Sequence, residues 1–233
     1  MGGIPTNEFG EVQDAEQNTI AGLYAIGECA AASFHGFNRL GTNSILELIT
    51  MGKLVAERVI EYIGEAPRTL PDLPAERFTE RVSGYMAATG RDSLGQIRNT
   101  MRATMTEKVS VFRTEQGISE AIQTLNELKE RVEKTALTER GLTMNQELLQ
   151  RWELDNLLDV SMVICKAALD RKESRGAHFR DDFPDRKDEY NYHTLVSMTQ
   201  FGRPELGRKE VDMSLFEAGG DHCEMFNIIE RKY

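Results

Sequence analysis

The sequence is poor in cysteine, with three in 233 residues: Cys29, Cys165 and Cys223. Their odd number and wide separation disfavour a disulfide framework, and no pair has the Cys-x-x-Cys spacing of a metal site. We therefore expect a reducing compartment. His193 and His222 also lack partners at ligand spacing, so the sequence predicts no metal site.

Long apolar runs are absent as well. None approaches the roughly 18–20 residues that span a bilayer. The nearest candidate, residues 45–63, contains charged side chains along its length, which is typical of an amphipathic helix. Residues 1–5 lack the basic and then apolar pattern of a secretory signal. The sequence therefore predicts no direct membrane span.

The chain has no excess of positive charge. It carries 28 Lys and Arg against 38 Asp and Glu, which gives a net charge of −10. Because non-specific nucleic-acid binding needs clustered basic residues, and those of this chain are dispersed, no nucleic-acid partner is expected. With 40% hydrophobic and 28% charged residues, the composition is that of a globular protein with a core.

Glycine content and periodicity divide the chain into unequal parts. Residues 1–66 are rich in glycine, whereas residues 92–172 are poor in glycine and periodic in apolar residues. Between them, residues 67–91 are expected to be a linker, because the prolines at its start cannot continue a helix. The charged residues 173–233 are expected to form an irregular tail with one strand, at residues 193–198.

The first part combines a strand, a glycine-rich loop and a helix. Residues 22–26 are an apolar run between glycines, which predicts a buried strand. The helix is expected to begin near Asn43, with Asn43 or Ser44 as its cap, and to stop at Gly64.

The middle part shows three helical periodicities, over residues 94–112, 118–136 and 143–169. Thr143 and Gln146 have the spacing of a capping box at the start of the third helix. Because short connections join the helices, we expect an antiparallel three-helix bundle, and the fold class is mainly α. The third helix is expected to bury an apolar stripe made of Leu149, Trp152, Leu157, Met162 and Leu169.

Residues suited to chemistry gather between positions 27 and 45. Glu28 follows the predicted strand, where a carboxylate can accept hydrogen bonds from the sugar hydroxyls of a dinucleotide, although a solvated Glu is the simpler alternative. The start of the helix near Asn43 offers free backbone amides to an anion. Arg39 has the planar fork of donors that suits a carboxylate.

Four segments carry a resemblance to a known family. Residues 1–6 are similar to H-Y-x-M-G-G-I-x-T, residues 22–28 to G-L-[FY]-A-x-G-E, and residues 35–45 to H-G-x-N-R-L-G-x-N-S-[LI]. Residues 173–188 are similar to E-S-R-G-A-H-x-R-x-D-[FY]-P-x-R-D-D. Over essentially its whole length, the chain therefore resembles the flavoprotein subunit of succinate dehydrogenase and fumarate reductase.

The resemblance implies FAD as the cofactor and assigns roles to particular residues. Glu28 would bind FAD hydroxyls, and Ser44 and Ile45 would present backbone amides to the flavin ring, with Asn43 in the same cofactor-binding set. Arg39 would hold one carboxylate of succinate or fumarate.

Three further residues are weaker candidates for the site. His35 could line the flavin pocket or make a structural hydrogen bond. His178 and Arg175 lie in the fourth segment, where they could assist flavin attachment or subunit docking, or could brace the loop. The sequence leaves these alternatives open.

The resemblance also implies the assembly. Family members are much longer, so residues 1–66 are expected to be the C-terminal remnant of a Rossmann-like, FAD-binding α/β domain. The complete enzyme would transfer a hydride between substrate and flavin and pass electrons to an iron–sulfur subunit. With a membrane anchor subunit, it would be cytoplasmic and peripheral on the inner face of the cytoplasmic membrane.

Two alternative functions stay open. An L-aspartate oxidase shares the glycine-rich flavin segment, but that family usually has Ala-Ser-Asn-Ser where this chain has residues 41–44. A non-catalytic helical module that docks a partner subunit belongs to another class. Bound flavin distinguishes the two classes, because a docking module is colourless.

Overall fold

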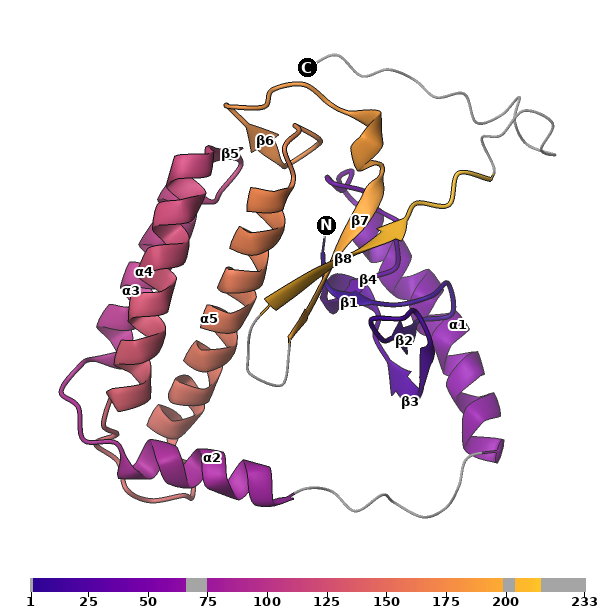
Figure 1. Ribbon diagram of the computed structural model, residues 1–233. Helices are drawn as coiled ribbons and strands as arrows, with labels where there is room; N and C mark the ends of the chain where they lie inside the picture. Colours follow the sequence, from indigo (N-terminus) through magenta and orange to yellow (C-terminus); the bar gives the residue numbers. More distant parts are fainter. Residues whose placement is uncertain (1, 66–74, 199–203, 215–233) are drawn as a thin grey trace.

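A computed structural model describes residues 2–65, 75–198 and 204–214 (Figure 1). Within these residues the fold is mainly helical, as the sequence predicts, and the strands form separate two-stranded pairs. The helices are α1 (Asn43–Glu65), α2 (Ala75–Ala87), α3 (Leu94–Lys108), α4 (Glu115–Lys134) and α5 (Gln146–Asp170), with 3-10 helices η1 (Gly27–Cys29) and η2 (Asp188–Tyr190). The strands are β1 (Ile4–Pro5), β2 (Glu11–Gln13), β3 (Thr19–Tyr24), β4 (Ala30–Ala31), β5 (Phe112–Arg113), β6 (Phe179–Arg180), β7 (Tyr192–Met198) and β8 (Pro204–Glu210).

Helices α3, α4 and α5 pack around the main apolar core (Figure 1). Each begins at a polar side chain, Ser93, Thr114 or Asn145, that accepts a hydrogen bond from a first-turn amide. In each helix, apolar residues at intervals of three or four positions lie on one face, and this face packs against the core. The fully buried members of this core include Ile97, Ile118, Ala121, Leu125, Leu154, Leu158 and Cys165.

The helix ends differ from the predicted ones. Helix α3 ends at Lys108, and Phe112 lies in strand β5 instead of the last helical turn. Helix α4 ends at Lys134, whereas the predicted periodicity continues to residue 136. Helix α5 is capped by Asn145 and not by Thr143, so the predicted capping box is wrong.

The buried face of α5 is also rotated from the predicted stripe. Leu149 and Leu157 are 52% and 41% exposed. Trp152 lies outside the core and packs on Phe78 of α2, with ring centroids 5.0 Å apart. Helix α5 carries apolar residues on more than one face, and contact with α3 and α4 decides which face is buried. The residues buried on α5 are Arg151, Leu154, Leu158, Ser161, Met162, Cys165 and Ala168.

The expected linker, residues 67–91, contains helix α2. This helix packs beside the start of α5, where Tyr85 is 7% exposed and its hydroxyl donates a hydrogen bond to Asp155. The ring of Tyr85 also meets Trp152 edge-on. Residues 75–87 are therefore folded onto the helical part; the prolines that suggested a linker lie outside the described residues.

The strand predicted at residues 22–26 belongs to an exposed hairpin. Strand β3 pairs antiparallel with β2. Ile20 and Leu23 are 41% and 49% exposed, so the prediction of a buried strand is wrong. The physical reason is that, in the part of the chain that the structure describes, β3 is paired with β2 alone, whereas β2 also forms a bridge from Val12 to Thr6, next to β1. Strands β1 and β4 form a separate parallel pair.

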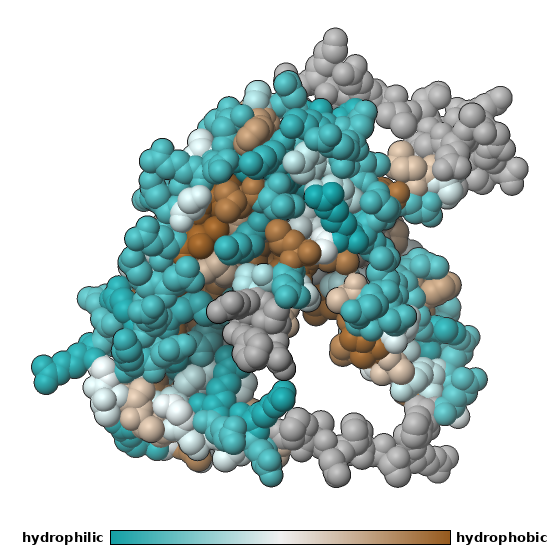
Figure 2. All heavy atoms as spheres, viewed as in Figure 1, coloured by the Kyte–Doolittle hydropathy of each residue, from teal (hydrophilic) through white to brown (hydrophobic). Residues whose placement is uncertain are grey.

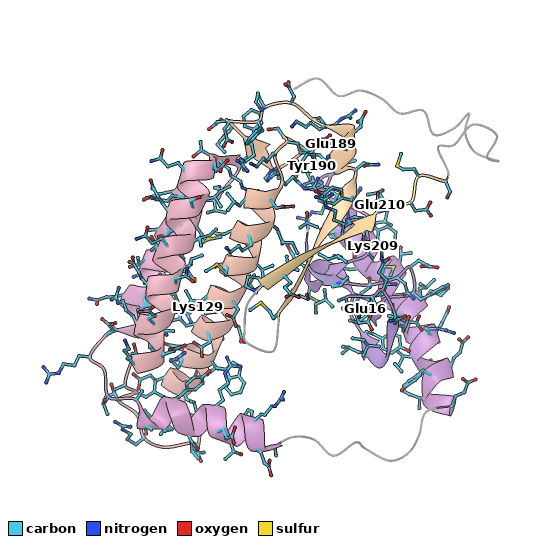
Figure 3. The ribbon with its side chains drawn as sticks, in the orientation of Figure 1. Glu16, Lys129, Glu189, Tyr190, Lys209 and Glu210 are labelled. Atoms are coloured by element: carbon cyan, nitrogen blue, oxygen red, sulfur yellow. The ribbon has the colours of Figure 1, made fainter. Side chains whose placement is uncertain are left out.

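The C-terminal part is more regular than the tail that was expected. The strand predicted at residues 193–198 lies within β7, which forms an antiparallel hairpin with β8. The hairpin lies between α5 and α1 (Figure 1). Lys209 of β8, labelled in Figure 3, donates a hydrogen bond from Nζ to Gln13 Oε1 at 2.7 Å and ties the hairpin to the N-terminal part. No helix among the described residues is long and apolar enough to cross a membrane.

Candidate functional site

The predicted site residues come from one continuous stretch between β3 and α1. After β3 the chain turns through η1, runs beside β1 as β4, and enters a loop of residues 32–42 that leads into α1. Gly27 has φ +69°, and a Cβ there would overlap the side chain of Leu48 on α1. The turn that carries Glu28 therefore lies directly against the beginning of the helix.

Glu28, Arg39 and Ser44 line one cavity, as the sequence predicts for a shared site. The volume of this cavity is about 40 Å³. A complete small-molecule pocket has roughly 300–1,000 Å³. The cavity is thus too small to enclose a small molecule. The other lining residues are Gly2, Gly27, Ala30, His35, Glu47 and Leu48.

A second cavity, of about 30 Å³, lies beside the first and is lined by residues 30–36, Glu47 and His193. His35 and Glu47 line both cavities. The His35 Nε2 atom lies 2.7 Å from Glu47 Oε2, and the two side chains are only 15% and 12% exposed. This pair connects the loop of residues 32–42 to helix α1.

The start of α1 fits a cofactor with negative charge. The helix is 23 residues long, and the amides of a helix N-terminus stabilise an anion. Ser44 Oγ is buried and has no hydrogen-bond partner in the protein. The Ser44 side chain, one of the two predicted alternatives, therefore does not cap the helix. Because a buried unsatisfied polar group costs about 1–3 kcal/mol, this hydroxyl is suited to a ligand that supplies a partner.

Asn43 and Ile45 do not line either cavity. The Ile45 side chain is 65% exposed, and its N–H donates to Thr42 O at 3.1 Å. The Asn43 N–H donates to Leu40 O at 3.3 Å. These bonds form a tight turn before the helix, in which Thr42 has φ +71°. The roles of Asn43 and Ile45 toward a cofactor stay predictions.

Sequence analysis missed Glu47, Ser33 and His193 at this site. The Ser33 Oγ atom lies 2.8 Å from His193 Nε2 across a separation of 160 residues. Burial, together with the charge of Lys209, lowers the pKa of His193. No local spacing could have indicated this pair, because only the position of hairpin β7–β8 creates it. Among the described residues, no group of three or more His, Cys, Asp or Glu could hold a metal ion.

His178 lies away from both cavities. It is 4% exposed, its Nδ1 atom accepts a hydrogen bond from Arg113 Nη1 at 2.6 Å, and its Nε2 atom donates to Arg171 O at 3.1 Å. Burial and the charge of Arg113 lower the pKa of His178 to about 4. The ring is therefore neutral at pH 7, and its contacts brace the surrounding loop.

Arg175 belongs to a buried network around Glu173. The carboxylate of Glu173 is fully buried and accepts hydrogen bonds from Arg171 Nη1 at 2.6 Å and Arg175 Nε at 2.9 Å. Burial raises the pKa of Glu173, but the hydrogen bonds from Arg175, the Lys187 N–H and Arg171 together lower it below its usual range. The network fixes the segment that follows α5, because breaking such a buried pair leaves an uncompensated charge.

Two family models match separate parts of the chain. The model of an FAD-binding domain matches residues 1–45, which include Glu28, Arg39 and Ser44. The model of the fumarate reductase flavoprotein C-terminal region matches residues 98–233. The N-terminal site thus belongs to an FAD-binding domain.

Curated relatives identify the family. The succinate dehydrogenase flavoprotein subunit of Rickettsia conorii is 38% identical over 221 residues, which cover 92% of this chain and 37% of the relative. The fumarate reductase flavoprotein subunit of Haemophilus influenzae is 35% identical over 211 residues, covering 88% of this chain and 34% of the relative. The chain belongs to the succinate dehydrogenase and fumarate reductase flavoprotein family, and it spans 34–37% of the length of these relatives.

Solved structures show the same fold. The flavoprotein of an E. coli quinol fumarate reductase variant matches with a TM-score of 0.82 and 32% identity, over 90% of this chain and 36% of that chain. Mycobacterium smegmatis Sdh1 in complex with UQ1 matches with a TM-score of 0.79 and 26% identity, over 97% of this chain and 38% of that chain. The resemblance that the motifs carried is confirmed.

Proposed function

We propose that this chain is the C-terminal part of a flavoprotein subunit that interconverts succinate and fumarate. The observation that carries the proposal is the cavity wall shared by Glu28, Arg39 and Ser44 at the start of α1. FAD supplies the hydride chemistry when bound. Glu28 would accept hydrogen bonds from FAD hydroxyls, and the N-terminal end of α1 at Ser44 would stabilise negative charge on the flavin.

Arg39 would bind one carboxylate of the dicarboxylate beside the flavin. A guanidinium offers two parallel N–H donors, so it fixes the orientation of a carboxylate as well as neutralising its charge. Glu47 and His35 would hold the Arg39 loop against α1 through their 2.7 Å contact. The small volume of the cavity supports a site that further protein completes.

The proposed domains follow the same scheme. Residues 1–66 would be the C-terminal part of a Rossmann-like FAD-binding domain, and residues 67–91 a connection that includes α2. Residues 92–172 would be an antiparallel three-helix bundle, and residues 173–233 a C-terminal tail. The packing of α3, α4 and α5 around one core, and the parallel pair β1–β4 ahead of α1, support this division.

The complete protein would pass electrons to an iron–sulfur subunit. A membrane anchor subunit would hold it at the inner face of the cytoplasmic membrane. Support comes from a solved relative, 31% identical, that is described as a quinol–fumarate reductase with menaquinol.

The proposal can be tested by purifying, from the source organism, the flavoprotein that contains this chain through an affinity tag on it. We expect flavin absorbance and succinate–fumarate interconversion with an artificial electron carrier. A colourless preparation would favour the docking module, and L-aspartate oxidation without succinate turnover would favour an L-aspartate oxidase.

The recombinant chain alone is the matched control. We expect it to catalyse neither direction, because it would form one wall of the site, and a positioned general acid supplied by the rest of the protein would by itself be worth on the order of 10² to 10⁴ in rate. Turnover by the chain alone would contradict the proposal that further protein completes the site.

A further inference from the structure

The position of Arg39 depends on the loop that carries it. Residues 32–42 contain neither helix nor strand, so no regular ladder of backbone hydrogen bonds fixes Arg39. Contacts of neighbouring side chains must do so. His35 bonds to Glu47 of α1, and Phe37, which is nearer to Arg39 in sequence, packs on the segment that follows α5.

Phe37 fits closely against Gly176 and Ala177. The Ala177 N–H donates a hydrogen bond to the Phe37 carbonyl oxygen at 3.2 Å. Gly176 has φ +58°, and a Cβ there would lie 2.8 Å from Phe37 Cβ and 2.9 Å from the Phe37 carbonyl carbon. Cβ atoms essentially never approach other heavy atoms to within 3.0 Å. Any residue other than glycine at position 176 would therefore displace the loop backbone at Phe37.

Arg171 covers the ring of Phe37 from another side. Its guanidinium carbon lies 4.6 Å from the ring centroid, which is within the range of a cation–π contact. Arg171 is 2% exposed. It donates hydrogen bonds to Glu173 Oε1 at 2.6 Å, Tyr190 O at 2.7 Å and Tyr192 O at 2.6 Å (Tyr190 is labelled in Figure 3). Phe37 thus rests on a group that cannot move without breaking buried, charge-assisted hydrogen bonds.

We propose that Phe37 is the positioning residue for Arg39: its contacts with Gly176 and Arg171 set where the Arg39 guanidinium stands in the cavity wall. The inference rests on the proposed function, in which Arg39 binds a dicarboxylate. A bidentate contact tolerates little displacement. Loss of the contacts that Phe37 makes with Gly176 and Arg171 therefore weakens dicarboxylate binding and turnover, while FAD stays bound through other residues.

The first test uses the flavoprotein that contains this chain, purified through an affinity tag on the chain. Phe37→Leu removes the aromatic ring, and Gly176→Ala perturbs the same contact from the opposite side. Phe34→Leu is the matched control, since Phe34 lies in the same loop with a side chain that is 58% exposed. We expect kcat/KM for succinate to fall roughly tenfold in the first two variants, with FAD content unchanged. In Phe34→Leu and Phe37→Tyr, kcat/KM for succinate should stay within about twofold of the value for the unsubstituted protein, because both variants keep an aromatic ring at position 37.

The second test needs no turnover. Trypsin cleaves after arginine, and cleavage of a folded chain reports how often the local segment opens. In the flavoprotein that contains this chain, mass spectrometry of the peptides should show several-fold faster cleavage after Arg39 in Phe37→Leu. Phe34→Leu should be cleaved at the rate of the unsubstituted chain.

The outcomes distinguish the positioning role of Phe37 from the proposed function. Equal kcat/KM in Phe37→Leu and Phe34→Leu overturns the positioning role. Loss of FAD together with activity in Phe37→Leu also overturns it, because Phe37 would then support the whole site. Absence of succinate turnover in the unsubstituted flavoprotein refutes the proposed function instead, and the trypsin cleavage rates then still decide whether Phe37 holds the loop.

Discussion

Arg39 is the residue whose chemistry is most specific, since it is the arginine that lines the cavity beside Glu28 and Ser44. In the flavoprotein purified through this chain, we expect Arg39→Lys to lower succinate turnover by roughly 10²-fold, although the charge is kept. An ammonium lacks the planar fork, and a displacement of about 1 Å at a reacting centre can cost roughly that factor. Steady-state kinetics and bound FAD are measured on the same preparation.

The rival role for Arg39 is structural. If it only holds the loop, the Lys variant should lose stability and FAD together. Full flavin occupancy with near-normal turnover would rule out binding of the substrate by Arg39.

The sequence was sufficient to place Glu28, Arg39 and Ser44 near one another, because all three lie close together in one strand–loop–helix stretch of the chain. It could not reveal the partners of that stretch. The His35–Glu47 contact depends on the path of an irregular loop, and the Ser33–His193 contact depends on a hairpin 160 residues away. Long-range packing of this kind leaves no periodic signal in the sequence.

At the scale of the helix, the cap of α5 provides a sharp test. Asn145 Oδ1 accepts the Leu148 N–H at 2.8 Å, and its Nδ2 donates to Gly141 O at 2.7 Å. We expect Asn145→Ala to lower the free energy of unfolding by about 1–2 kcal/mol. Urea denaturation followed by circular dichroism measures this change.

Thr143→Ala is the matched control for the cap, since the sequence pattern favoured Thr143 and the structure does not use it. A change within about 0.5 kcal/mol is expected for this exposed residue. Equal losses in the two variants would contradict the assignment of the cap to Asn145.

Helical periodicity located α3, α4 and α5, but it did not determine which face of α5 is buried. Leu157 and Leu158 are adjacent and equally apolar, yet one is 41% exposed and the other 0%. The prediction of a buried strand at residues 22–26 was wrong for a similar reason, since an apolar run does not show whether other parts of the protein cover it. Helix α2 was missed because prolines just before it suggested a linker.

The two halves of the molecule should differ in stability. Apolar surface gathers toward the middle of the molecule between them (Figure 2), and on α1 the side chains of Ile45 and Ile49 are 65% and 69% exposed. In α4, by contrast, Ile118 and Leu125 are 0% exposed. For the recombinant chain, hydrogen exchange should therefore show strong protection of amides in residues 118–136 and weak protection in residues 20–63.

The control for this measurement is the flavoprotein purified through the chain, in which the amides of residues 20–63 should gain protection. Equal protection of the two regions in the chain alone would show that the N-terminal part is stable by itself.

The whole molecule should also lose stability in mild acid because of His178. Burial and the charge of Arg113 hold the pKa of His178 at about 4, below its usual value of 6.5. The unfolded state therefore binds more protons between about pH 6.5 and pH 4, and stability falls as the pH drops through that window. Since one pKa unit corresponds to about 1.4 kcal/mol, the loss is on the order of 3 kcal/mol.

His178→Gln should flatten this pH dependence, because glutamine can still donate to Arg171 O and accept from Arg113 but does not titrate. Asp182→Asn is the control: hydrogen bonds from Arg180 lower the pKa of Asp182 to about 2 from 3.8, so its contribution is lost only as the pH falls below about 4. Urea unfolding at pH 7, 6, 5 and 4 separates the two groups. If the His178→Gln chain lost as much stability between pH 7 and pH 4 as the unsubstituted chain, the buried neutral histidine would not be the origin of the acid sensitivity.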